Sequence, residues 1–519
     1  MAMVWMACFA LPVRAQYLDP IGATALRAVT TNLNGASIKV GQVEAGYESA
    51  TNWQVNPGVI GQPTSVFTYY YGTSPYFTVG SASTYPNSLG GPSGHANIVA
   101  GVFYGITNGV ATNLAHINNY DADTFVNYYV NQLRPIPERI VNQSFTFGTY
   151  STNVDQIYDN YAAQFGVLLI SGAGFGGQPV YTPATCYNGV GVGSYAWNTP
   201  DGPTPDGRSK PDIIAAGFSE TSYTTPQVSG AAALLMQAGL RGDGGSGSIT
   251  NWAVDIRTLK ALLLNGAVKP LGWTNSPAAP LDARYGAGML NVLNSYQQLA
   301  GGKRGSIVST TNAPGGAHPP TGAAGTVAVL SGWDYGTNTS GTSPSPYEAV
   351  NHYYFNVTNK WAGARFTATA TLVWNRQTNQ TAINNLDLFL YDTANSNLVL
   401  CSTSRVDNVE HLYKTNLAQG RYDLQVWKAG GSGIVSAAEP YALAFEFFSD
   451  TLSLSRSGTN AVISWPVYPD GFLVESATNL AAPAWIANTL PAVITNGSNR
   501  ILLPAPNGAQ FFRLRRPDF

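Results

Sequence analysis

The sequence predicts an α/β domain with a parallel sheet and helices on both faces, followed by two all-β domains. The chain has 519 residues, which suggests more than one domain. Within the first 300 residues, short apolar strands such as residues 213–216 alternate with helical segments such as residues 256–268. Beyond residue 350, strand patterns separated by turn residues follow one another, which is typical of antiparallel sandwiches and barrels.

The composition favours a secreted protein that is rich in turns and β structure. Charged residues make up only 10% of the chain, and the formal net charge is −2. The surface is therefore expected to be largely uncharged and hydrogen-bonding. Basic residues form no block before Arg513, Arg515 and Arg516, so the charge pattern indicates neither nucleic-acid binding nor an anionic membrane.

Residues 1–15 predict a signal peptide that is cleaved before Gln16. The segment is apolar, too short to span a bilayer, and ends at Ala15 in a small-residue cleavage pattern. No later apolar stretch is long enough to predict a transmembrane helix. We therefore expect an extracellular protein without a membrane span.

Cysteine usage predicts no disulfide framework. Of the three cysteines, Cys8 falls in the predicted signal peptide, and Cys186 and Cys401 lie far apart. We expect the latter two to be unpaired buried thiols, and a single interdomain disulfide is the alternative.

The most informative stretch runs from Gly207 to Met236. A turn-rich approach leads into the apolar strand 213–216, and a helical pattern follows from Thr224, with Pro226 expected in its first turn. Ser222 would then lie at the positive end of a buried helix, where N–H groups favour an attacked carbonyl oxygen. From these residues alone, an N-capping role for Ser222 is the simpler interpretation.

Residues 221–230 have the sequence TSYTTPQVSG. This sequence resembles the nucleophile segment of the subtilisin-like serine peptidases, T-S-x-[AST]-[AT]-P-x-V-[AS]-G. The approach GRSKPDI is also similar to that of the family. The resemblance implies that Ser222 is the nucleophile. One departure is Glu220, which stands where the family usually has Gly.

Glu44 is the candidate acid of the catalytic triad. Residues 37–46 predict a strand that ends in a glycine turn, and in an α/β sheet active sites form at such strand ends. The segment resembles the family motif V-x-V-[IV]-D-[ST]-G, with Glu44 in place of Asp. Glu48 is a weaker candidate for the same role, and an ordinary strand-end acid is the structural alternative.

His95 is the candidate general base. It opens a helix of small and apolar residues at positions 93–101, and it is one of only five histidines. The segment resembles the family motif H-[GA]-T-H-x-[AV]-G, with Ile98 in place of the second His. The order Glu44, His95, Ser222 is the order that the family uses.

The resemblance also implies substrate-binding and oxyanion positions. Residues 140–145 resemble the family strand that runs along the substrate, which makes Asn142 and Ser144 candidates for substrate binding. Residues 167–177 resemble the segment that carries the oxyanion Asn, but Phe175 stands in its place. The backbone N–H of Ser222 is the donor that remains.

The expected domain order is a signal peptide at 1–15, a subtilisin-like peptidase domain with a doubly wound parallel sheet at 16–302, a linker at 303–326, a β-sandwich or barrel at 327–449, and a small fibronectin-like β module at 450–519. The resemblance covers about residues 36–300. The 327–449 region is similar to the β-barrel of long alkaline subtilases, some of which bind calcium there. Asp387, Asp392 and Asp407 are possible ligands, but surface and turn roles are the simpler interpretation, so no metal or other cofactor is assigned.

Three functions are compatible with these features. The first is a secreted serine endopeptidase that acts on protein or peptide substrates through a Ser-His-Glu triad and an acyl-enzyme. The second is a weak or inactive relative that serves as a binding or scaffold protein, suggested by Phe175, Glu44, Glu220 and the short stretch before the first strand, where a pro-segment would be expected. The third is a sugar-binding adhesin carried by the β domains. The sequence indicates no oligomeric state.

Overall fold

The computed structural model describes residues 17–47, 49–73, 78–196, 199–359, 363–449, 452–466, 472–495, 498–504 and 508–515. The predicted signal peptide and Glu48 lie outside the described residues.

The N-terminal part is built on an eight-stranded sheet in the order β10-β9-β8-β7-β1-β6-β3-β4. Neighbouring strands are parallel, except that β4 pairs antiparallel with β3. The strands are β1 (Lys39–Glu44), β3 (Phe67–Thr73), β4 (Thr78–Ala82), β6 (His116–Asp121), β7 (Ile140–Gln143), β8 (Leu168–Gly172), β9 (Val190–Ser194) and β10 (Ile213–Ala215). The predicted α/β domain with a parallel sheet is confirmed.

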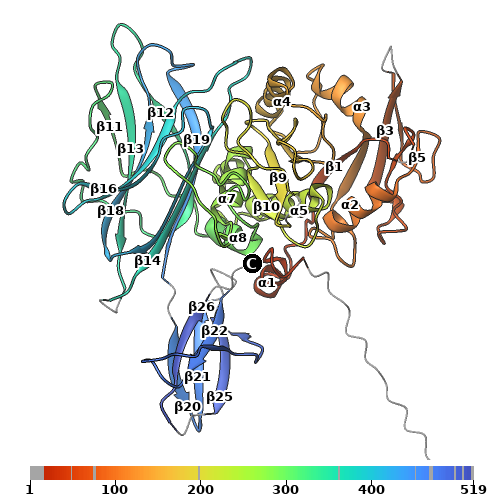
Figure 1. Ribbon diagram of the computed structural model, residues 1–519. Helices are drawn as coiled ribbons and strands as arrows, with labels where there is room; N and C mark the ends of the chain where they lie inside the picture. Colours follow the sequence, from red (N-terminus) through yellow and green to blue (C-terminus); the bar gives the residue numbers. More distant parts are fainter. Residues whose placement is uncertain are drawn as a thin grey trace, which may run out of the picture.

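Helices cover both faces of this sheet, as predicted. Figure 1 shows α2 (Gly94–Tyr104) and α5 (Thr221–Arg241) on one side and α4 (Thr152–Phe165) on the other. Helix α7 (Ile256–Asn265) and helix α8 (Val292–Ala300) follow α5 in the chain. The shorter elements are α1 (Ala23–Val29), β2 (Asn52–Gln54), η1 (Thr64–Val66), β5 (Gly91–Pro92), α3 (Ala122–Thr124), η2 (Phe125–Val130) and α6 (Ile249–Ala253).

Strand β1 lies at the point where the winding direction of the sheet changes. Its neighbours are β6 on one side and β7 on the other. From β7 the chain continues outward through β8, β9 and β10, whereas β3 and β4, on the other side, precede β6 in the chain. Ligands bind in the crevice at the carboxyl ends of strands at such a point. Glu44 is the last residue of β1, so the sheet places its side chain at this crevice.

A β-sandwich follows, as predicted for this region (Figure 1). One sheet has the order β11-β13-β18-β15-β16 and the other β12-β19-β14-β17. The strands are β11 (Val308–Asn312), β12 (Ser331–Thr339), β13 (Glu348–Val357), β14 (Phe366–Trp374), β15 (Leu386–Asp392), β16 (Asn397–Ser402), β17 (Val409–Leu417), β18 (Gly420–Lys428) and β19 (Ala438–Phe448). Strand β11 falls within the expected linker but pairs with β13, so this part of the chain belongs to the sandwich.

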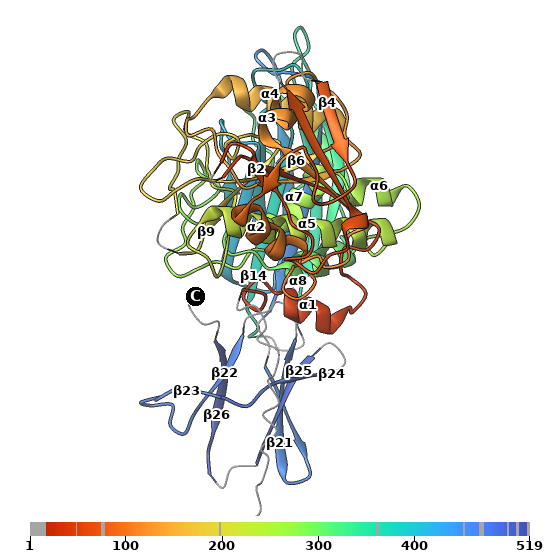
Figure 2. The same cartoon turned by 90° about the vertical axis from the view of Figure 1, so that its right-hand side faces the viewer.

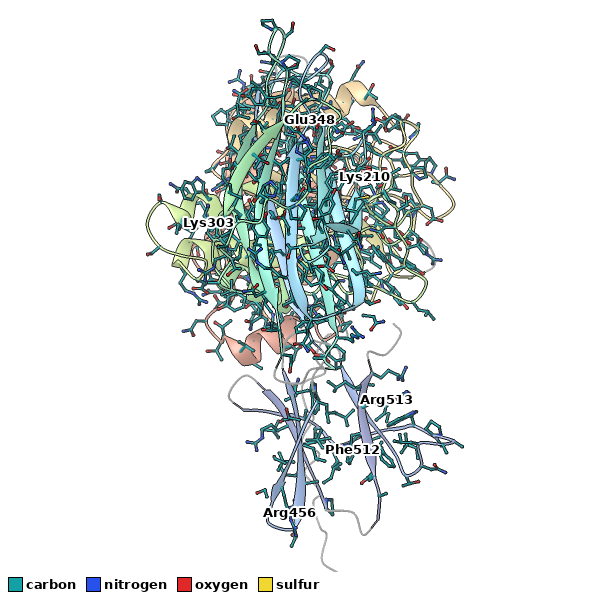
Figure 3. The ribbon with its side chains drawn as sticks, turned by 90° about the vertical axis from the view of Figure 1, so that its left-hand side faces the viewer. Lys210, Lys303, Glu348, Arg456, Phe512 and Arg513 are labelled. Carbon is teal, nitrogen blue, oxygen red and sulfur yellow. The ribbon has the colours of Figure 1, made fainter. Side chains whose placement is uncertain are left out.

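The sandwich and the α/β part share a buried boundary. Trp333 and Val373 of the sandwich belong to the same apolar core as α5 and α7, and the indole N–H of Trp333 donates to the carbonyl oxygen of Leu299 at 3.0 Å. In Figure 3 the sandwich is in front, with Lys303 and Lys210 labelled on opposite sides of it. Lys303 pairs with Asp334 of β12 at 2.6 Å, which ties the start of the expected linker to the sandwich.

The last residues form a small module of two sheets, which lie side by side in Figure 2. Its strands are β20 (Ser453–Ser457), β21 (Asn460–Pro466), β22 (Leu473–Ala477), β23 (Ile486–Ala487), β24 (Val493–Thr495), β25 (Ser498–Pro504) and β26 (Phe511–Arg515). Trp465 is buried in its core, and Phe512 packs against that core (Figure 3). The guanidinium of Arg513 lies 4.4 Å from the Trp485 ring.

Within the described residues, none of the helices combines the length and the apolar character needed to cross a bilayer. Cys186 and Cys401 are free, as expected; Cys186 is buried and Cys401 half-buried.

Candidate active site

Glu44 is held rigidly at the end of β1. Its side chain is 1% exposed, and its two carboxylate oxygens have different partners. Oε1 accepts from the amide of Gln42 at 2.7 Å, and Oε2 lies 2.9 Å from Nδ1 of His95. Gln42 is itself held, because the Tyr104 hydroxyl donates to its Oε1 at 2.5 Å. This network presents one carboxylate oxygen to the imidazole.

His95 is the second residue of α2, and this position explains its orientation. The hydroxyl of Ser93 caps the helix by accepting from the N–H of Ala96 at 3.2 Å. The contact between Nδ1 and Glu44 leaves Nε2 as the nitrogen available for other groups. Burial favours the neutral imidazole, but the hydrogen bond and charge of Glu44 and the charge of Glu220 outweigh it, so the pKa of His95 is raised above its ordinary value.

Ser222 is the second residue of α5, which begins at Thr221 rather than at Thr224. Pro226 is therefore inside the helix, and the prediction that it occupies the first turn is wrong. The missing N–H of Pro226 would have bonded to the carbonyl oxygen of Ser222, four residues earlier. Instead, the hydroxyl of Ser144 donates to this oxygen at 2.8 Å.

Asn142 and Ser144, the two predicted substrate-binding residues, are buried beneath the start of α5. The Asn142 amide donates to the Ser144 hydroxyl at 3.0 Å and accepts from the Ser229 hydroxyl at 2.9 Å. The Ser222 hydroxyl donates to the carbonyl oxygen of Ser144 at 3.2 Å. Both side chains are thus engaged in supporting the nucleophile segment.

The segment that resembles the oxyanion loop lies beside the start of α5. The Thr221 hydroxyl donates to the carbonyl oxygen of Gly174 at 2.8 Å and accepts from its N–H at 3.2 Å. The next residue, Phe175, is 61% exposed, and its side chain has no hydrogen-bond donor. The backbone N–H of Ser222, in the first turn of α5, is the donor that the sequence predicts for an oxyanion.

Two tyrosine rings lie beside the imidazole, and neither was predicted from the sequence. The ring centroid of Tyr47 lies 5.3 Å from that of His95, and the ring centroid of Tyr223 lies 5.7 Å from it. Each tyrosine follows a predicted catalytic residue closely in the chain, Tyr47 after Glu44 and Tyr223 after Ser222. Gln42 was also missed, although it lies two residues before Glu44 on the same strand face.

The structure therefore brings Glu44, His95 and the start of α5 together from distant parts of the chain. In the described residues, the Ser222 hydroxyl is hydrogen-bonded to Ser144 and not to His95. Rotation about its χ1 bond would release it from this carbonyl. In unliganded enzymes such catalytic hydrogen bonds are often loose and tighten only with substrate.

Two of the possible calcium ligands, Asp392 and Asp407, accept hydrogen bonds from nearby groups. Asp407 accepts from the N–H of Ser209 at 2.7 Å and from the hydroxyl of Ser404 at 2.7 Å. Asp392 accepts from the N–H of Ala394 at 2.9 Å, as a turn acid does. Among the described residues, no group of three or more His, Cys, Asp or Glu side chains is arranged to hold a metal ion.

Comparisons with known proteins agree with the α/β part of this structure. Residues 69–288 match the profile of the subtilase family, peptidase S8. This range includes the residues at and around His95 and Ser222 but begins after Glu44. None of the curated protein sequences matches the chain.

The solved structures to which the chain is similar include three proteases. A lanthipeptide protease is 17% identical with a TM-score of 0.39, over 55% of this chain and 94% of that chain. A protease from Pseudoalteromonas arctica PAMC 21717 is 17% identical with a TM-score of 0.36, over 51% and 91%. A psychrophilic subtilisin-like protease from Pseudoalteromonas sp. AS-11 is 14% identical with a TM-score of 0.33, over 54% and 97%.

Proposed function

We propose that this chain, whose residues 69–288 belong to the subtilase family, is a secreted serine endopeptidase that acts on protein or peptide substrates. The observation that carries the proposal is the 2.9 Å contact between Nδ1 of His95 and the buried carboxylate of Glu44. A buried carboxylate that is hydrogen-bonded to one imidazole nitrogen leaves the other nitrogen able to accept a proton. Further support comes from Tyr223, the residue after Ser222, whose ring centroid lies 5.7 Å from that of His95.

In the proposed mechanism, the Ser222 hydroxyl attacks the scissile carbonyl while Nε2 of His95 takes its proton. Glu44 holds the imidazole tautomer and stabilises the imidazolium that forms. His95 then gives the proton to the leaving amine, and an acyl-enzyme remains on Ser222. Water, activated by the same imidazole, attacks the acyl-enzyme and releases the second product.

The oxyanion would be stabilised by N–H groups in the first turn of α5, where the helix dipole is also favourable. Phe175 contributes no donor from its side chain. Loss of one oxyanion donor costs about 3–4 kcal/mol, or ~10²–10³ in turnover. We therefore expect turnover below that of an enzyme with a complete oxyanion site.

The second candidate function is a weak or inactive relative that serves as a binding or scaffold protein. The exposed Phe175 side chain in the position of the oxyanion donor favours it. Glu220 adds a negative charge two residues before Ser222, and this charge opposes a developing oxyanion. In this case the crevice would bind a polypeptide without cleaving it.

A fluorophosphonate probe separates the two candidates, because it reacts with an activated serine without requiring a particular peptide. The purified full chain should be labelled, and Ser222→Ala should abolish the labelling. Ser219→Ala is the matched control, since Ser219 is exposed in the same turn and should leave labelling intact. Absence of labelling between pH 5 and 10 would instead support the scaffold function.

The proposed secretion can be tested separately. Expression of the whole chain with its native N-terminus should yield a mature protein that begins at Gln16. Amino-terminal sequencing of protein from the medium measures this directly. Retention of residues 1–15 on protein inside the cells would contradict it.

A further inference from the structure

Glu220 is a charged side chain at the candidate active site that the proposed mechanism does not use. It is exposed, lies at the N-cap position of α5, and its backbone carbonyl accepts from the N–H of Tyr223 at 3.1 Å. Its side chain makes no capping hydrogen bond. Within the described residues its carboxylate has neither a hydrogen bond nor an ion-pair partner. The charge is therefore available to a ligand.

The position of Glu220 relative to His95 indicates which half of a substrate it would meet. The imidazole must protonate the leaving amine, so it borders the residues that follow the scissile bond. Glu220 is hydrogen-bonded through its backbone carbonyl to the N–H of Tyr223, and the Tyr223 ring centroid lies 5.7 Å from that of His95. Burial first and then the charge of Glu220 raise the pKa of Tyr223. Glu220 therefore lies close to the imidazole that would serve the leaving group.

Two aromatic rings lie beside the same imidazole. Tyr47 is 54% exposed and contacts the His95 ring, and Tyr223, half-buried, contacts it from α5. Aromatic faces attract cations through the ring quadrupole, and a free carboxylate attracts them through its charge. Glu44, the other acid nearby, is buried and already occupied by His95 and Gln42.

We propose that Glu220, together with the rings of Tyr47 and Tyr223, selects substrates that carry a lysine or arginine side chain in the first two positions after the scissile bond. This inference rests on the proposed peptidase function. A cation bound there also offsets the negative charge that Glu220 places beside the oxyanion. Glu220 thereby acts as a specificity-determining residue rather than only as a favourable charge at a helix N-terminus.

The test begins with digestion of a denatured protein mixture by the wild-type chain, in which mass spectrometry identifies a cleaved sequence. Internally quenched peptides are then made that differ from this sequence only after the scissile bond, with Lys, Gln or Glu. We expect kcat/KM to be about tenfold higher for the Lys peptide than for the Glu peptide, with the Gln peptide between them, because one exposed carboxylate and two partly exposed rings attract a cation. The preference should weaken as ionic strength rises.

Single substitutions distinguish the effect of the Glu220 charge on specificity from general effects on the structure. Glu220→Gln should reduce the Lys-to-Glu ratio to about twofold, and Glu220→Lys should reverse it, because the charge and not the helix sets the preference. Asp123→Asn is the control, since Asp123 is an exposed acid in the first turn of α3 and should leave the ratio unchanged. A ratio that is the same in wild type and Glu220→Gln would overturn the inference.

The same peptides distinguish failure of this inference from failure of the proposed function. Cleavage of all three at equal rates would remove the specificity role and leave the peptidase function intact. If the wild type neither cleaves peptides nor reacts with the fluorophosphonate, the peptidase function fails. The specificity role of Glu220 then fails with it, because no scissile bond defines the positions that Glu220 would select.

Discussion

Ser144 and Ser222 exchange two hydrogen bonds across the candidate active site. The Ser144 hydroxyl donates to the Ser222 carbonyl oxygen at 2.8 Å, and the Ser222 hydroxyl donates to the Ser144 carbonyl oxygen at 3.2 Å. The first bond replaces the intrahelical bond that Pro226 cannot make. The pair therefore anchors the start of α5, including the Ser222 hydroxyl, to the segment after β7.

These two bonds predict that Ser144→Ala lowers the free energy of unfolding, and that the size of this loss depends on the presence of Pro226. The substitution leaves the Ser222 carbonyl oxygen without its partner, at a cost of about 1–3 kcal/mol in the free energy of unfolding. In a Pro226→Ala background the new N–H can bond to the same oxygen, so the cost of Ser144→Ala should be smaller. Urea unfolding of the four proteins measures both costs. Equal costs in the two backgrounds would contradict the role of Pro226.

Restoring an oxyanion donor should accelerate the reaction. Phe175→Asn places a side-chain amide in the position where the family resemblance expects it, and we expect turnover to rise by about 10². The rate of fluorophosphonate labelling and peptide hydrolysis both report this step. Phe175→Leu, which removes the ring without adding a donor, is the control. A rise of the same size in both variants would point to the bulk of Phe175 instead.

Glu44→Gln should reduce kcat without unfolding the chain. The amide keeps the size of the side chain, but it removes the charge that stabilises the imidazolium, and it can stabilise the wrong tautomer of His95. We expect kcat to fall by about 10³–10⁴. Glu44→Asp, which keeps the charge on a shorter side chain, should retain more activity. Unchanged kcat in Glu44→Gln would remove Glu44 from the mechanism.

The pH profile should depend on Glu220. Catalysis needs neutral His95, and the pKa of His95 is raised, so the acid limb of kcat/KM should lie above the ordinary histidine range. Glu220→Gln removes a negative charge and lowers this pKa, which moves the acid limb to lower pH. Glu44, Tyr47 and Tyr223 also face the imidazole and are unchanged in this variant. A shift to higher pH would contradict the assignment.

A buried ion cluster at the approach to β10 should be essential for stability. Asp212 lies 2.6 Å from the ammonium of Lys210 and 3.0 Å from that of Lys260. Burial raises the pKa of Asp212, but the two lysines lower it more, so the net shift is downward. Its contribution is therefore present above the unfolded-state pKa and is lost as pH falls through the folded-state value.

Asp212→Asn leaves two buried ammonium groups without their counter-charge and should cost about 3–5 kcal/mol at pH 7. Asp243→Asn is the control, because Asp243 pairs with the more exposed Arg241 and should cost less than about 1 kcal/mol. Thermal unfolding of both variants at pH 7 measures the difference. Similar losses in the two variants would contradict the role of burial.

Much of the fold was predictable because its signals are local. Apolar runs and turn residues predicted the strand before Glu44 and the strands of the sandwich, and the small-residue pattern predicted the helix after Ser222. The start of that helix was not predictable. Thr221 begins it because its hydroxyl bonds to the backbone of Gly174, a contact between segments 47 residues apart in the chain.

The sequence by itself determined which reactive side chains the chain carries. It also determined the strand ends and helix starts on which they lie, because hydrophobic periodicity and turn residues are properties of neighbouring residues. Only the tertiary structure decided that the Glu44 carboxylate bonds to both Gln42 and His95. It also decided that the Ser144 hydroxyl donates to the carbonyl oxygen that Pro226 leaves without an intrahelical partner, and that the rings of Tyr47 and Tyr223 lie beside the His95 ring. These contacts join side chains from separate elements, and their geometry depends on how the sheet and the helices pack.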